Sequence, residues 1–66
     1  FLHKYKESIE ITQIAIYLLD KDKIDNNKLR IAILNLNGLA NHRLANYNKS
    51  ITSYKKVLKF VLWSHL

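Results

Sequence analysis

Cysteine, methionine and proline are absent from this 66-residue chain, and glycine occurs once. Without cysteine there is neither a disulfide framework nor a thiolate metal site, so apolar side chains alone must build the core. Without proline and with a single glycine, the chain lacks the turn-dense composition of small β proteins, and its abundant Leu, Ile, Lys and Asn favour long helices. The composition therefore predicts an all-α protein.

Long apolar runs are missing as well. The run from Ile14 to Leu19 is far shorter than the roughly 20 residues that a membrane-spanning helix needs. The start, Phe1-Leu2-His3-Lys4, has no signal-peptide pattern, so we expect a cytoplasmic protein without a membrane span. It also lacks an initiating Met, and we expect residues 1–66 to be one helical-repeat segment of a longer protein.

Acidic residues are few, with five Asp and Glu against eleven Lys and Arg and a formal net charge of +6. Two carboxylates fall on an expected helix surface and three in an expected loop, and no nucleophile, base and orienting group converge. We therefore expect no catalytic residue and no enzyme activity. The histidines lack metal-ligand spacing, so we expect no metal and no cofactor; they are His3, His42 and His65.

Three segments have helical periodicity: His3 to Leu19, Asn27 to Ala45 and Tyr47 to His65. Asparagines precede the second and third segments, where a side-chain oxygen accepts from the first free backbone N–H groups. The short connections predict three antiparallel helices, with N-caps at Asn26 or Asn27 and at Asn46.

Apolar residues suggest which faces are buried. In the second segment two opposite stripes are expected to be buried: Leu29, Ile33, Leu36, Ala40 and Leu44, and Ile31, Leu34, Gly38 and Ala45. In the third, the expected buried arc is Tyr47, Ser50, Ile51, Tyr54, Val57, Leu58, Val61 and Leu62. The first segment has a second, outer apolar face that lacks a partner within the chain: Ile11, Ile14 and Leu18.

The first and third segments resemble each other. Tyr5-Lys-Glu-Ser8-Ile9 aligns with Tyr47-Asn-Lys-Ser50-Ile51 at an offset of 42 residues. A helix that recurs after one intervening helix is typical of stacked α-hairpin arrays, in which each unit hides its apolar face against the next. The chain would hold about one and a half repeats.

The same residues resemble the tetratricopeptide (TPR) family, through Leu34, Gly38, Tyr47, Ser50, Ile51, Tyr54, Val57 and Leu58. The resemblance implies TPR-like hairpins of a right-handed superhelix that bind a peptide or a partner helix. The longer repeat and the composition look like the TPR domains of bacterial peptide-sensing regulators of the Rap, NprR and PlcR kind, which implies quorum sensing and transcription regulation. The chain departs from the TPR pattern at Asn37, Asn41 and Ala45 and has no closing proline.

A ligand strip is predicted on the second helix, at the positions that face the concave groove in the TPR pattern: Lys28, Asn35, Leu39 and His42. An amide offers a donor and an acceptor to a peptide backbone. The alternative is a solvated polar strip without a ligand. Asn37 and Asn41 either form a second strip or hydrogen-bond across the seam between helices, and we favour the seam.

A candidate basic surface lies on the third helix: Lys49, Lys55, Lys56 and Lys59. These lysines could contact nucleic-acid phosphates, an acidic protein or an anionic membrane surface, or they could simply be solvated.

Taken together, the TPR resemblance and the ligand strip predict a peptide- or protein-binding module. The alternatives are a self-associating helical segment, in which a second copy covers the outer face of the first helix, and a nucleic-acid-binding domain, which is less favoured.

Overall fold

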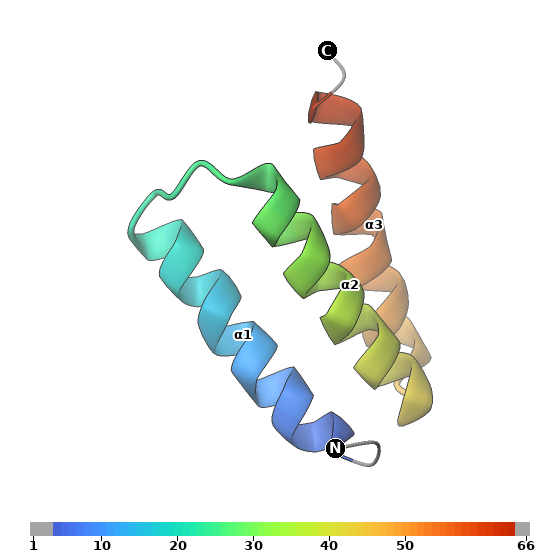
Figure 1. Ribbon diagram of the computed structural model, residues 1–66. Helices are drawn as coiled ribbons and strands as arrows, with labels where there is room; N and C mark the ends of the chain where they lie inside the picture. The colour runs from blue at the N-terminus through green and yellow to red at the C-terminus, as the bar shows by residue number, and fades with distance from the viewer. Residues whose placement is uncertain (1–3, 65–66) are drawn as a thin grey trace.

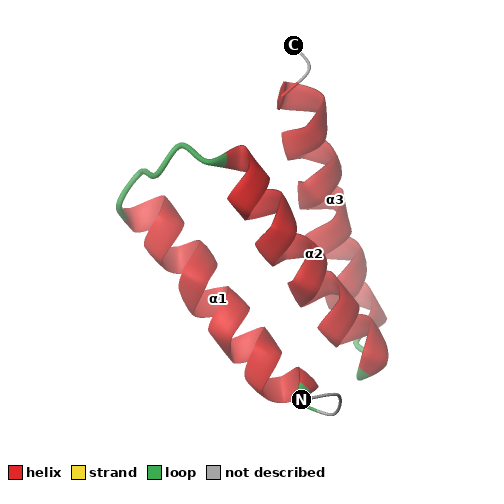
Figure 2. Ribbon diagram, in the orientation of Figure 1, coloured by secondary structure: helices red, strands yellow, loops and turns green. Residues whose placement is uncertain are grey.

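The computed structural model describes residues 4–64, which fold into three helices joined by two short connections (Figure 1). Helix α1 spans Tyr5–Lys21, α2 spans Asn27–Arg43 and α3 spans Tyr47–Ser64. Only helix and loop occur in this part of the chain (Figure 2). α2 lies in the middle and packs against both neighbours, while the backbones of α1 and α3 stay apart. The predicted all-α fold is confirmed.

Local signals placed the helix boundaries well. The Asn26 side chain accepts a hydrogen bond from the Leu29 backbone N–H at 3.0 Å, which confirms it as the N-cap of α2. α2 and α3 begin at the predicted residues, α2 ends two residues before the predicted Ala45, and α1 runs two residues beyond the predicted Leu19. The predicted outer ends of the first and third helices, His3 and His65, lie outside the described residues.

Both connections begin with the same turn, although neither contains glycine. After α2 the Asn46 N–H donates to the Asn41 carbonyl at 2.8 Å and the Ala45 N–H donates to the His42 carbonyl at 3.0 Å. This is the Schellman pattern, which requires a left-handed residue at the position of Ala45, where φ is 61°. Lys23 takes the same role after α1, with φ 52°. L-residues adopt this conformation at a cost, which is why glycine usually occupies it.

The fully buried part of the core is more polar than apolar. Among the described residues, three hydrophobic side chains are buried, Leu19, Leu34 and Ala40, against five polar ones: Thr12, Asn37, Asn41, Ser50 and Ser53. The predicted stripes of α2 are therefore wrong in part. Leu34, Gly38 and Ala40 are buried, as predicted. Four other members of the stripes are exposed instead: Leu29, Leu36, Leu44 and Ala45.

The predicted buried arc of α3 is also wrong in part. Ser50 is buried and Val57 and Val61 are half-buried, but the large members of the arc are 40–58% exposed: Tyr47, Ile51, Tyr54, Leu58 and Leu62. The helix is rotated so that Ser53 and Phe60 face inward instead. The prediction assumed that apolar side chains are the buried ones. In the structure, the serine hydroxyls of α3 lie buried against α2 instead.

That contact is centred on Gly38. The Ser50 hydroxyl donates to the Gly38 carbonyl at 2.8 Å, and a Cβ on residue 38 would come within 2.7 Å of the Tyr54 ring. Two helix backbones approach this closely only where side chains are absent or small. Gly38 and Ser50 therefore let α2 and α3 approach closely at this point.

Arg30 connects all three helices near the loop between α1 and α2. Its guanidinium pairs with the Asp20 carboxylate and donates to the carbonyls of Leu19 and Ile24, both at 3.2 Å. The same group lies 5.7 Å from the centre of the Phe60 ring. One side chain of α2 therefore holds the end of α1, the loop after it and α3, because a guanidinium presents several donors in a fixed plane.

The left-handed turn residues generate a stability prediction. Ala45→Gly should raise the free energy of unfolding by about 0.5–1 kcal/mol, since relief of the strained φ outweighs the greater freedom of glycine in the unfolded chain. Ala32→Gly, at an exposed position inside α2, should lower it by about 1 kcal/mol. Urea denaturation followed by circular dichroism measures both, and an equal loss in the two variants would contradict the turn assignment.

Candidate functional site

Asn37 joins the three helices through its side-chain amide. Its nitrogen donates to the Thr12 hydroxyl of α1 at 2.9 Å, and its oxygen accepts from the Ser53 hydroxyl of α3 at 2.6 Å and from the Asn41 amide at 3.0 Å. Asn41 in turn accepts from Asn46 at 3.3 Å. The prediction of hydrogen bonds across the seam between helices is confirmed for Asn37, whereas the Asn41 side chain bonds within α2 and to Asn46 of the turn.

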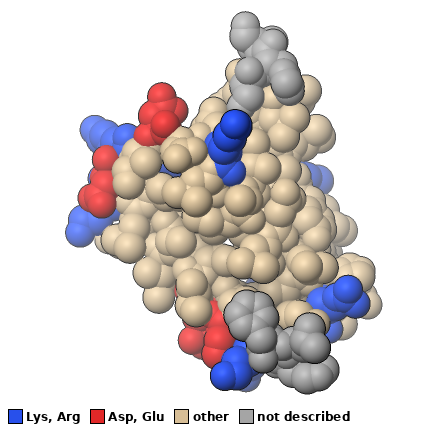
Figure 3. All heavy atoms as spheres, viewed as in Figure 1, with Lys and Arg blue, Asp and Glu red and all other residues tan. Residues whose placement is uncertain are grey.

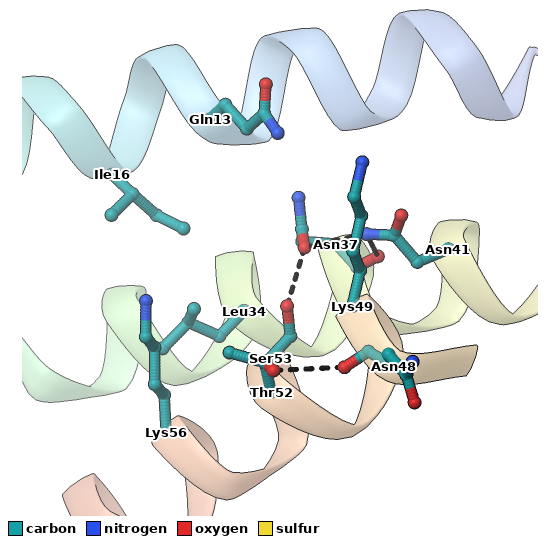
Figure 4. Close-up of a pocket in the computed structure, with 10 residues that line it drawn as sticks. All are labelled: Gln13, Ile16, Leu34, Asn37, Asn41, Asn48, Lys49, Thr52, Ser53 and Lys56. Carbon is teal, nitrogen blue, oxygen red and sulfur yellow. Dashed lines mark hydrogen bonds between the residues drawn. The ribbon is translucent and has the colours of Figure 1, made fainter. Parts of the chain in front are cut away.

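A groove opens above this network because α1 and α3 lie on different sides of α2. It holds a cavity of about 440 Å³, within the size range of small-ligand sites. Figure 4 shows side chains from all three helices around it. Its lining consists of Gln13 and Ile16 from α1, Leu34, Asn37 and Asn41 from α2, and Asn48, Lys49, Thr52, Ser53 and Lys56 from α3.

The groove continues toward the Arg30 end of the molecule. A second cavity of about 180 Å³ shares Ile16, Leu34 and Lys56 with the first, so the two are parts of one channel-like depression. Arg30 and Phe60 line this end. A depression that runs past several helical turns has the shape needed for an extended segment rather than for a compact small molecule.

The groove offers polar groups that the fold does not use. The network consumes the amides of Asn37 and Asn41, whereas Gln13, Asn48 and the two lysines make no side-chain hydrogen bond within residues 4–64. Ile16 and Leu34 supply apolar surface beside them. Amides and ammonium groups next to aliphatic side chains can bind a peptide backbone and its side chains.

The predicted ligand strip lies elsewhere on α2. Lys28, Asn35, Leu39 and His42 are exposed, and none of them lines either part of the groove. Successive helical residues are about 100° apart, so Asn35 points roughly 160° away from Asn37. The strip therefore occupies the convex side of α2, where the His42 ring contacts Tyr47 edge-on at a centroid distance of 5.5 Å.

The predicted basic surface divides into two parts. Lys49 and Lys56 line the groove, whereas Lys55 lies on the other side of α3. The Lys59 ammonium lies 4.7 Å from the centre of the Trp63 ring, in cation–π contact, at the edge of the smaller cavity. The four lysines thus do not form the single face that their proximity in sequence suggested.

Sequence reasoning missed Gln13, Thr12 and Ser53 as members of the site. Thr12 donates to the carbonyls of Ser8 and Ile9, at 2.8 and 2.9 Å, and so leaves its lone pairs for Asn37. One usable signal existed for Thr12, which interrupts a largely apolar face of α1, but none existed for Ser53, whose neighbours one turn away are mostly polar. No sequence signal pointed to Gln13, because its position in the groove depends on where α1 lies relative to α3.

Within residues 4–64, no three His, Asp or Glu side chains gather where a metal ion could be held. No helix in the same stretch has the length and hydrophobicity needed to cross a bilayer. Comparisons with protein-family models, curated proteins and solved structures found no match. The resemblance to TPR proteins therefore stays a prediction, and the function is inferred from the geometry of the groove.

The network under the groove predicts an unequal effect of two similar substitutions. Asn37→Ala should lower the free energy of unfolding by about 2–4 kcal/mol, since it leaves the buried hydroxyl of Ser53 without its acceptor and breaks the link to Thr12. Asn35→Ala, on the exposed side of the same helix, should change it by less than about 0.5 kcal/mol. Thermal denaturation compares them, and similar losses would show that the network adds little stability.

Proposed function

We propose that this chain is a binding module without catalytic chemistry, and that its groove holds an extended peptide or an extended segment of a partner protein. The groove itself supports this proposal most: its floor is a rigid, fully hydrogen-bonded amide network, while its walls present polar groups that have no other partner within the described residues. A preorganised floor favours binding, because it loses little conformational freedom when a ligand enters.

The proposal assigns separate roles to the two kinds of lining residue. Gln13 and Asn48, from opposite walls, would hydrogen-bond the ligand backbone, since an amide donates and accepts at once. Ile16 and Leu34 would contact an apolar ligand side chain. Asn37 and Asn41 would act only through the shape of the floor, because their hydrogen-bonding groups are already used.

An amide NMR titration of the ¹⁵N-labelled chain with a pooled library of short peptides tests the proposal. Chemical-shift changes should centre on the groove residues, and Gln13→Ala and Asn48→Ala should each weaken binding by about three- to tenfold, the value of one or two hydrogen bonds. The matched controls are Asn35→Ala and His42→Ala, which lie on the convex side of α2.

The same titration separates the groove from the predicted strip. Unchanged binding in the groove variants together with loss in Asn35→Ala and His42→Ala would move the site to the convex side of α2. Shifts that appear only with duplex DNA, and that fall with rising salt, would favour the nucleic-acid alternative instead.

A further inference from the structure

A continuous row of large apolar side chains runs along α3 on the side turned away from the groove. We call it the α3 ridge, and its members are Tyr47, Ile51, Tyr54, Leu58 and Leu62. Their spacing of three or four residues places them on one helix face over the whole length of α3. All five are between 40% and 58% exposed. A contiguous apolar surface of this kind marks an interaction site in a stable protein.

The charges around the ridge have one sign. All five carboxylates of the chain lie between Glu7 and Asp25, so residues 26–66 carry seven Lys and Arg and no Asp or Glu. Lys55 lies one turn from both Ile51 and Leu58, whereas Lys59 lines the smaller cavity of the groove. On the face that Figure 3 shows, which is viewed as in Figure 1, the Asp and Glu side chains lie over α1 and the loop that follows it.

We propose that the α3 ridge is a docking surface for an anionic lipid membrane, on which α3 lies parallel to the surface. An apolar helix face flanked by lysines is the arrangement of interfacial helices, which bury that face at the boundary of headgroups and acyl chains. The lysine stems extend along the apolar surface while their ammonium groups reach lipid phosphates. Tyr47 and Tyr54 suit the same boundary, since each combines an apolar ring with a polar hydroxyl.

Charge decides between a membrane and a second copy of the chain. A dimer through the ridge would bring the lysines and arginines of α2 and α3 of two copies nearer to each other without a carboxylate from either helix to compensate. An anionic surface turns the same lysines into favourable contacts, each worth roughly a fivefold gain in partition coefficient. The groove faces the other way, so membrane docking and peptide binding do not compete for the same surface.

Co-sedimentation of the full chain with lipid vesicles tests the proposal. It should bind vesicles of phosphatidylcholine mixed with phosphatidylserine and bind phosphatidylcholine vesicles far more weakly. The variant Lys55→Gln should lose about fivefold in partition coefficient. Its matched control is Lys56→Gln, which removes the same charge from the neighbouring position on the groove side of α3 and should retain most of the binding.

A second pair of variants tests the apolar contact. Leu58 and Ile14 are 58% and 59% exposed, so a serine at either position should leave the fold intact, which circular dichroism checks. Leu58→Ser should weaken vesicle binding about tenfold and Ile14→Ser, on α1, should not. Because the chain has no cysteine, an environment-sensitive fluorophore on Leu58→Cys or Ile14→Cys reports burial at one chosen site.

Three results would overturn the proposal. The first is equal binding to neutral and anionic vesicles, and the second is equal loss in the two serine variants. The third is a dimer in analytical ultracentrifugation that Leu58→Ser abolishes, combined with no vesicle binding, which would assign the ridge to a second copy of the chain.

Discussion

The Asn37 side chain reaches both neighbours of the central helix, and the arrangement of the molecule depends on it. It links Thr12 of α1 to Ser53 of α3. The backbones of these two helices make no direct contact with each other. Only three hydrophobic side chains are fully buried among the described residues, so apolar burial alone discriminates poorly between alternative packings. A buried polar network does discriminate, because each misplaced partner leaves a donor or acceptor unsatisfied at a cost of about 1–3 kcal/mol.

Local features of the chain were predictable, and relative placement was not. Asn26 correctly predicted the start of α2, because N-capping depends only on neighbouring backbone groups. Gly38 and Ser50 indicate a close crossing, since the absence of bulk has few other uses inside a helix. The buried faces were misjudged because many large apolar residues of small proteins stay exposed, as Ile51 and Leu58 do.

The groove lay beyond sequence reasoning for a related reason. Whether Gln13 and Lys49 face each other depends on the angle at which α1 and α3 leave α2, and no short-range pattern encodes that angle. Asn37 was correctly predicted to hydrogen-bond across the seam between helices, but the sequence did not show that this seam is the floor of a groove. The strip at Asn35, Leu39 and His42 was derived from the TPR pattern, and the convex position of these residues follows from their spacing to Asn37.

The hydroxyl of Ser50 has one more effect, on the rotation of α3 about its own axis. A turn of α3 by one residue would put Lys49 or Ile51 in the place of Ser50, and neither has a small hydroxyl that can donate to the Gly38 carbonyl. α3 is therefore held at one angular setting. That setting turns Lys49 and Lys56 toward α1 and Leu58 toward the opposite side, so a single small side chain keeps the helix from exchanging its charged and apolar faces.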